Sequence, residues 1–164
     1  MSRLNFYKFN HFFWLQFALA CIDLNDYDRA EKYLNDALAY VPRDNFIPFQ
    51  ISTAQAHLYL DRIKKDKSPN IIVDLERADR ILSMPAKSHL DNEERLLRLI
   101  KYYINQEFKD VVCSSIETKN FFIECLKHAC KRLEKFLYIC PTFDKNEFME
   151  LMLEISKEIA FLQK

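Results

Sequence analysis

The chain has 164 residues, enough for one domain with its own hydrophobic core. Its 24 basic and 24 acidic residues balance, so it lacks the one-sided basic charge typical of proteins that bind nucleic acids. It contains no glycine, although about 7% of an average protein is glycine. Because β-rich folds need many glycine-dependent turns, the composition predicts an all-α fold. It also excludes glycine-dependent phosphate loops, dinucleotide-binding fingerprints and nucleophile elbows.

The first three helices are expected over residues 10–24, 26–40 and 46–65, where apolar residues recur with helical spacing. Asn25 forms the first turn and Asp26 caps the second helix, which ends before Pro42. For the first helix the expected inward stripe is Phe13, Phe17, Ala20 and Leu24. For the third helix it is Ile47, Ile51, Ala54 and Leu58, with Ile63 as a further candidate.

Further helices are expected over residues 69–84, 91–103, 118–139 and 145–162, with a short irregular piece at 108–115. Their expected N-caps are Ser68, Asp91 and Asp144. The last two helices should form an antiparallel hairpin because few residues join them. Basic residues on one of them and acidic residues on the other are expected to face each other, namely Lys127, Lys131, Arg132 and Lys135 against Glu147, Glu150, Glu154 and Glu158.

A specific order of large, small and turn residues runs through the first two helices: Trp14, Ala18, Asn25, Tyr27, Ala30, Leu34, Ala37 and Pro42. Over residues 12–43 this order resembles the tetratricopeptide repeat, with Asn25 where that family prefers glycine. A second unit would start at Ala54, Ala56 and Tyr59 and include Ala78, which requires a lengthened third helix. A third unit, over 95–111, is more distant. The expected fold is an irregular helical-repeat array of about seven helices, one domain over 1–164 with a repeat-like part (1–84) and a C-terminal helical part (91–164).

A second resemblance is narrower. Residues 13–20, followed by 27–30 and 49–51, are similar to the helical-repeat tails of large bacterial anti-phage defence proteins. Those tails follow NTPase or NAD-hydrolysing effector domains and are similar to sensors of phage proteins. This resemblance implies a sensor or scaffold role in antiviral defence, and the chain itself carries no effector motif.

Two groups of residues are candidates for binding a protein partner. The first is a polar stripe on the third helix, at spacings of three, four and four: Gln50, Thr53, His57 and Asp61. Changing His57 and Asp61 is expected to weaken binding without unfolding the chain. The second is a crowd of aromatic residues near the N-terminus that one helix face cannot bury: Phe6, Phe9, Phe12 and Phe13. These aromatics predict either packing under later helices or docking onto another subunit or domain.

The sequence indicates no catalytic residue, metal site or cofactor. Cys125, His128 and Cys130 do not share one helix face, so inert cysteines are the expected interpretation. The odd count of five cysteines, without a signal peptide or a membrane-spanning stretch, predicts a cytoplasmic protein. We therefore expect a non-catalytic protein-interaction module. The alternatives are a self-associating structural subunit that uses the aromatic N-terminus and a small helical enzyme or metal protein.

Overall fold

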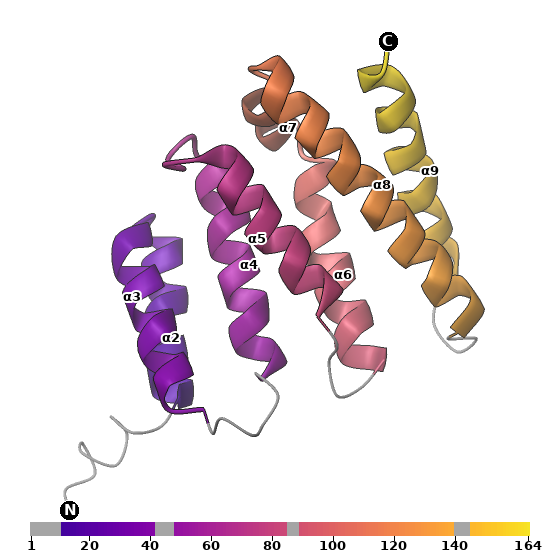
Figure 1. Cartoon of the computed structure of the whole chain (residues 1–164). Helices are drawn as coiled ribbons and strands as arrows, with labels where there is room; N and C mark the ends of the chain where they lie inside the picture. The colour runs from indigo at the N-terminus through magenta and orange to yellow at the C-terminus, as the bar shows by residue number, and fades with distance from the viewer. Residues whose placement is uncertain (1–10, 42–47, 85–88, 140–144) are drawn as a thin grey trace, which may run out of the picture.

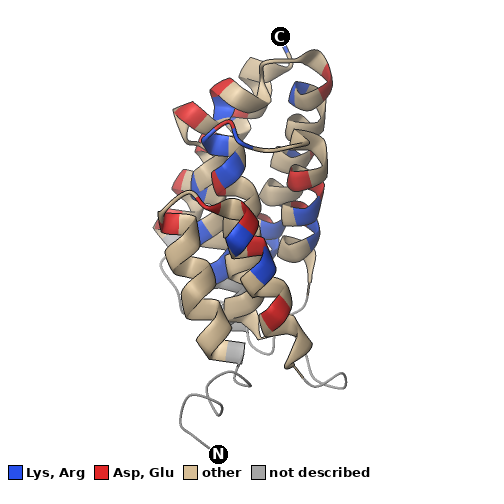
Figure 2. Ribbon diagram, turned by 90° about the vertical axis from the view of Figure 1, so that its left-hand side faces the viewer, with Lys and Arg blue, Asp and Glu red and all other residues tan. Residues whose placement is uncertain are grey.

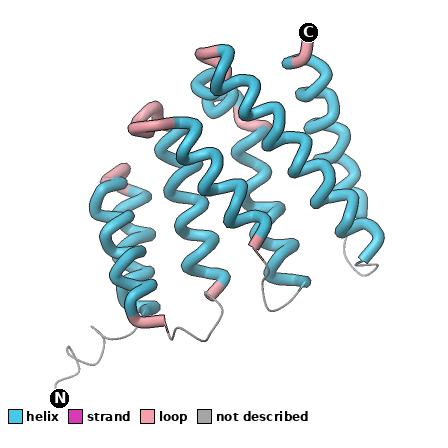
Figure 3. Tube along the Cα trace, viewed as in Figure 1, coloured by secondary structure: helices cyan, strands magenta, loops and turns pink. Residues whose placement is uncertain are grey.

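The computed structural model describes residues 11–41, 48–84, 89–139 and 145–164. These residues form eight α-helices and no strand (Figure 3). In chain order the helices are α2 (His11–Asp23), α3 (Tyr27–Ala39), α4 (Phe49–Lys64), α5 (Ile71–Ser83), α6 (His89–Tyr103), α7 (Gln106–Val112), α8 (Ile116–Ile139) and α9 (Lys145–Leu162). The predicted all-α class is confirmed, and α8 and α9 pack side by side as the expected antiparallel hairpin (Figure 1).

Two turns show how the chain manages without glycine. Asn25 and Asp66 have positive φ angles of 59° and 57°, in the left-handed region that glycine usually occupies. Each follows the C-cap of a helix. At the end of α2 the backbone N–H of Asp26 donates to the carbonyl of Cys21 (2.8 Å), and that of Asn25 donates to Ile22 (2.9 Å). The same two bonds close α4 around Asp66, so both turns are Schellman motifs built on Asn or Asp.

The start of α5 differs from the expectation. Asn70 is the N-cap, and its side chain accepts a hydrogen bond from the backbone N–H of Val73 (3.2 Å). Ser68 does not cap the helix. Its hydroxyl donates instead to the carboxylate of Asp74, in the first turn of α5 (2.6 Å). The reason is that Asp74 is buried and requires hydrogen-bond donors, which Ser68 is placed to supply.

Two later helices, in contrast, begin earlier than expected. α6 starts at His89, so Asp91 lies within the helix and is not its cap. α8 starts at Ile116, after Ser115, whose hydroxyl accepts from the backbone N–H of Thr118 (3.2 Å). The third predicted cap, Asp144, lies outside the described residues.

The helices lie in two layers (Figure 1). α3, α5 and α8 form one layer, α2, α4 and α6 form the other, and α9 follows beside α8 at the end of the array. α4 is the central helix because it contacts α2, α3, α5, α6 and α7. Basic and acidic segments are interspersed over the helices (Figure 2), in agreement with the balanced composition.

The first two helix pairs share internal spacing. Ile22, Asn25, Leu34 and Ala37 recur 41 positions later as Ile63, Asp66, Leu75 and Ala78. The three apolar positions of each set are buried, and the two turn residues share the left-handed backbone. This spacing exceeds the roughly 34 residues of a tetratricopeptide repeat. Within the described part of the chain, α4 has 16 residues and α2 has 13.

The inward face predicted for α2 is wrong. Leu15, Ala18 and Ile22 are buried, whereas Phe17 is 44% exposed and Leu24 is 79% exposed. α2 is apolar on nearly every side, so periodicity alone could not identify the face that meets α3 and α4. The small side chain of Ala18, which is fully buried, lies where the neighbouring helices approach.

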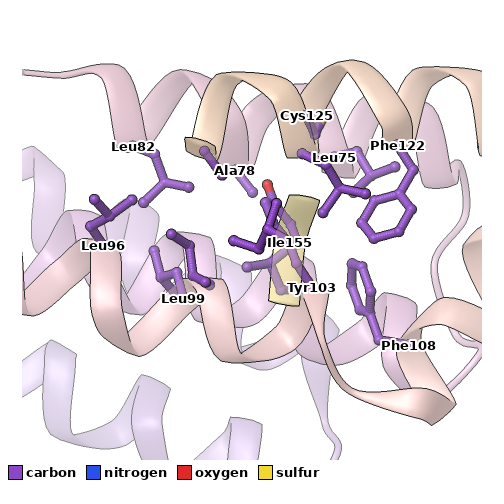
Figure 4. Close-up of a cluster of buried hydrophobic side chains, with 14 of the residues drawn as sticks. Leu75, Ala78, Leu82, Leu96, Leu99, Tyr103, Phe108, Phe122, Cys125 and Ile155 are labelled. Atoms are coloured by element: carbon purple, nitrogen blue, oxygen red, sulfur yellow. The ribbon is translucent and has the colours of Figure 1, made fainter. Parts of the chain in front are cut away.

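Two hydrophobic clusters meet in α4. Its residues Ile51, Ala54 and Leu58 pack with α2 and α3, whereas Ala56, Leu60 and Ile63 belong to a larger cluster with the later helices. At the centre of the larger cluster Tyr103, Phe108 and Phe122 contact one another through their rings, at centroid distances of 5.5 to 6.0 Å (Figure 4). α4 therefore contributes a different face to each cluster and ties the two parts of the array together.

Candidate binding face

The polar stripe predicted on the third helix does not form one exposed row. Gln50 is exposed and His57 and Asp61 are half-buried, but Thr53 is buried. The Thr53 hydroxyl has no hydrogen-bond partner within the described part of the chain. The structure therefore brings together only His57 and Asp61, and it removes Thr53 from any surface that a partner could contact.

Asp61 is the centre of a hydrogen-bond cluster that links three helices. The phenol of Tyr27, at the start of α3, donates to its Oδ2 (2.6 Å). The phenol of Tyr102, near the end of α6, lies 3.2 Å from its Oδ1 and 2.6 Å from Nδ1 of His57. The phenol of Tyr27 also lies 3.1 Å from the side-chain oxygen of Asn25. These five residues define what we call the Asp61 cluster: Asn25, Tyr27, His57, Asp61 and Tyr102.

Counting hydrogens assigns the histidine tautomer. Tyr102 has one hydroxyl hydrogen but two close neighbours. Both contacts are hydrogen bonds only if Tyr102 donates to Asp61 and Nδ1–H of His57 donates to the phenol oxygen. Nε2 of His57 is then an unprotonated acceptor, and no donor among the described residues bonds to it.

Burial sets the protonation states of the cluster. Burial lowers the pKa of His57, and the nearby Asp61 and Asp23 carboxylates only partly offset this effect. Burial also raises the pKa of both Tyr27 and Tyr102, and the Asp61 carboxylate raises them further. At neutral pH the imidazole is therefore uncharged and both phenols keep their hydrogens. The cluster presents hydrogen-bond acceptors next to a single negative charge.

Exposed residues surround the Asp61 cluster on the layer formed by α2, α4 and α6. Asp23 is the last residue of α2, and Leu24, which follows it, is among the most exposed large apolar residues in the described part of the chain. Arg98 on α6 is close enough to influence His57, and its guanidinium bonds Glu94 at 2.8 Å. We call this surface, with the Asp61 cluster at its centre, the α4 face.

The sequence did not predict the parts played by Tyr27 and Tyr102. The repeat pattern predicts Tyr27 only as one of its large residues, but its hydroxyl reaches Asp61, 34 positions away. Tyr102 lies 41 positions from Asp61. No local pattern marks such pairs, because they depend on how α4 packs against α3 and α6.

The predicted aromatic group lies only partly in the described structure. Phe12 is 45% exposed and Phe13 is half-buried. The ring of Phe13 makes edge-to-face contacts with Trp14 and Phe17, at centroid distances of 5.5 and 5.0 Å. Trp14 in turn stacks on Tyr33 of α3. Phe6 and Phe9 lie outside the described residues. The described aromatics thus form a partly exposed group on α2 and α3.

Arg62, near the end of α4, is buried. Its guanidinium makes two hydrogen bonds of 2.7 Å to the buried carboxylate of Asp74. A third, of 3.2 Å, reaches Glu31 on α3, and the guanidinium lies over the ring of Tyr59. This group links α3, α4 and α5 and engages all three guanidinium nitrogens of Arg62, which indicates a structural role.

The expected facing charges of the last hairpin do not pair with each other. Arg132 bonds Asp79 of α5 (2.9 Å), and Lys127 bonds Glu124 of its own helix (3.3 Å). Glu158 pairs with a lysine of α7, Lys109, at 3.2 Å. α8 and α9 are therefore held together by apolar packing, as their shared cluster shows.

The four cysteines in the described part of the chain do not resemble catalytic thiols. Burial raises the pKa of Cys125 to about 12 and also raises the pKa of Cys21, Cys113 and Cys130, which disfavours the nucleophilic thiolate. His128, near Cys125 in sequence, contacts Asp79 instead (3.0 Å). Within the described ranges there is no group of three or more side chains that could hold a metal ion. A search of the same residues finds no helix of the length and apolarity needed to cross a bilayer.

Comparison of the chain with protein-family models, curated proteins and solved structures finds no match. Function is therefore inferred from the chain's own residues and their geometry.

Proposed function

We propose that the protein is a non-catalytic protein-recognition module of the tetratricopeptide-like helical-repeat type, and that it binds a partner segment on the α4 face. The observation that carries the proposal is the Asp61 cluster. Two tyrosines from neighbouring helices hold His57 and Asp61 in fixed positions, half-open to solvent, on the central helix of one layer. Fixed polar groups of this kind orient a ligand at little entropic cost.

The chemistry of the α4 face favours a partner that supplies donors. Nε2 of His57 is an acceptor, and the Asp61 carboxylate keeps acceptor capacity beyond its two tyrosine bonds. Asp23 adds a second negative charge nearby, and Leu24 adds exposed apolar surface. A segment that carries a lysine or arginine next to an apolar side chain fits this combination.

The structure also changes how the proposal is best tested. Asp61 accepts bonds from two half-buried or buried hydroxyls, so its replacement would disturb packing as well as binding. His57→Ala and Asp23→Lys are better variants because neither removes a bond to Asp61. Glu76→Lys is the matched control for charge reversal, since Glu76 is exposed on α5 in the opposite layer.

In the experiment, the immobilised full chain captures partners from the native cells. The affinity of a captured partner is then measured by titration, for the unchanged protein and for each variant. His57→Ala and Asp23→Lys should each weaken binding about tenfold or more, which corresponds to about 1.4 kcal/mol. Glu76→Lys should bind as the unchanged protein does. Equal losses in all three variants, or no loss in the first two, would refute binding on the α4 face.

A narrower form of the proposal is that the module is the sensor or scaffold part of a bacterial defence system. It is supported by the resemblance of residues 13–20, 27–30 and 49–51 to the tails of such proteins. Two of these stretches, 13–20 and 27–30, pack together as the α2–α3 pair. Co-expression with a neighbouring effector gene during phage infection tests it: protection should require the chain and should be lost in Asp23→Lys.

A further inference from the structure

Helix α9 carries apolar residues on two sides. One side is buried against the rest of the array through Phe148, Leu151, Ile155 and Leu162. The other is exposed: Met149 is 59% exposed and Leu153 is 56% exposed. A helix at the edge of a folded chain normally turns a polar side to water, so this second apolar side is unusual.

The exposed side of α9 has an ordered pattern of sizes. Met149, Leu153, Ser156 and Ala160 follow one another at spacings of four, three and four, which places them along one line of the helix. All four are exposed. The two large side chains occupy the first half of this line and the two small ones occupy the second half. We call these four residues the α9 stripe.

The surface along the α9 stripe is hollowed. A shallow depression of about 430 Å³ is lined by Met149, Met152, Leu153 and Ser156, together with Glu150. A second, of about 410 Å³, runs between α8 and α9 and also reaches Ser156. The small side chain of Ser156 therefore lies where both depressions meet, and it leaves room for a side chain from outside.

We propose that the α9 stripe is a self-association surface, on which the α9 helix of a second copy packs antiparallel about a twofold axis that passes between residues 154 and 155. In this arrangement Met149 lies against Ala160 of the partner subunit, and Leu153 lies against Ser156 of the partner subunit. Each large side chain meets a small one, as close helix packing requires. Parallel pairing would instead put large against large and small against small, leaving a gap at one end.

Charges beside the α9 stripe fit the same arrangement. Glu150 and Lys157 are both exposed. They are about two helical turns apart, so they lie along the same edge of the α9 stripe. The antiparallel pairing brings Glu150 next to Lys157 of the partner subunit, and the twofold axis repeats this contact. Neither residue takes part in an ion pair within the described part of the chain. The interface would therefore supply both with partners.

The size of the α9 stripe sets the expected strength of association. α9 has 18 residues and is therefore about 27 Å long. One face of such a helix, together with the adjoining edge of α8, would bury about 1,000 Å² in total, which is at the lower end of the area buried by specific interfaces. The dimer should therefore form and dissociate with concentration.

The partly exposed aromatics at the other end of the array provide the control. Phe17 is exposed to a similar degree as Leu153, on α2, but its neighbours do not show the paired large and small pattern. Association through the aromatic N-terminus and association through α9 therefore predict opposite effects for Phe17→Asp and Leu153→Asp.

Sedimentation equilibrium of the full chain, over concentrations up to the millimolar range, tests the proposal. The unchanged protein should reach a monomer–dimer equilibrium, and Leu153→Asp should raise the dissociation constant at least tenfold while Phe17→Asp leaves it unchanged. Circular dichroism should show the same helix content for all three. A protein that stays monomeric throughout, or that loses association only in Phe17→Asp, would overturn the proposal.

A charge exchange tests the antiparallel register and does not depend on Leu153→Asp folding. Glu150→Lys alone and Lys157→Glu alone should each weaken the dimer several-fold, because each places like charges together. The variant with both changes restores opposite charges and should recover most of the affinity. A double variant that associates no better than the single ones would overturn the antiparallel pairing.

Discussion

Arg62 and Asp74 form a doubly hydrogen-bonded ion pair in the interior of the array. Nε and one terminal nitrogen of the guanidinium each lie 2.7 Å from a carboxylate oxygen, and the side chains are only 5% and 1% exposed. The hydroxyl of Ser68 donates a further bond to Asp74. The pair holds α4 to α5, and the bond from Arg62 to Glu31 extends this link to α3.

Replacing one residue of this pair should lower the free energy of unfolding far more than replacing both. Arg62→Leu leaves the Asp74 carboxylate buried without its counter-ion and should lower the free energy of unfolding by about 3–5 kcal/mol, measured by urea denaturation. Arg62→Met combined with Asp74→Leu should recover most of this loss. Glu76→Ala breaks an exposed pair with Arg80 and should change stability by less than about 1 kcal/mol. Similar losses from the single and double variants would contradict this prediction.

The left-handed turn at Asp66 predicts effects of opposite sign at neighbouring positions. Asp66→Gly relieves a positive φ angle and should leave the free energy of unfolding unchanged or raise it by up to about 1 kcal/mol. Lys65→Gly, at a φ angle of −83°, adds only chain flexibility and should lower it by roughly 0.5–1 kcal/mol. Thermal unfolding of both variants provides the measurement. Equal destabilisation would mean that the turn has another backbone conformation in solution.

Two adjacent hydroxyls on α4 should also respond in opposite directions. The Thr53 hydroxyl is buried with no partner in the described chain, so Thr53→Val should raise the free energy of unfolding by about 1 kcal/mol. The Ser52 hydroxyl donates to the Phe49 carbonyl and accepts from buried Arg95, so Ser52→Ala should lower it by about 1–3 kcal/mol. Urea denaturation separates the two. A stabilising Ser52→Ala, or a destabilising Thr53→Val, would contradict the assigned contacts.

The Asp61 cluster predicts a pH dependence of stability. The pKa of His57 is lowered on folding from its ordinary value of about 6.5, so the unfolded chain binds the proton more readily. His57 should therefore not affect the free energy of unfolding above pH 6.5. Below pH 6.5 its contribution should lower that free energy as the pH falls, until the pKa of His57 in the folded state is passed. His57→Gln should remove this part of the decline, measured by urea denaturation between pH 7 and 5. A decline of the same size in His57→Gln would show that other groups cause it.

Several features of the fold could be predicted from the residues alone because their causes are local. The absence of glycine indicated helices, and the predicted cap Asp26 is confirmed, with its side chain accepting from the backbone N–H of Arg29. The positive φ angle of Asn25 agrees with its place at a turn where the repeat pattern prefers glycine. The start of α5 was missed because Ser68 and Asn70 are both good caps, and buried Asp74 decided between them.

The candidate site was much less predictable. His57 and Asp61 were chosen for their spacing on one helix, yet Thr53, on the same predicted stripe, is covered by neighbouring helices. The residues that position Asp61, Tyr27 and Tyr102, are 34 and 41 positions away from it. Spacing along one helix identifies residues on a common side, but it does not show which part of that side another helix covers.

The sequence by itself determined the all-α class, the ends of most described helices and the first turn, because backbone preferences and helical periodicity act over a few residues. Only the tertiary structure decided which side of α2 is buried, since that helix is apolar nearly all round and Leu15 is buried whereas Phe17 is exposed. It also decided that Arg62 is buried with Asp74, and that Tyr27 and Tyr102 converge on Asp61. These outcomes depend on contacts between helices far apart in the chain, which no local pattern contains.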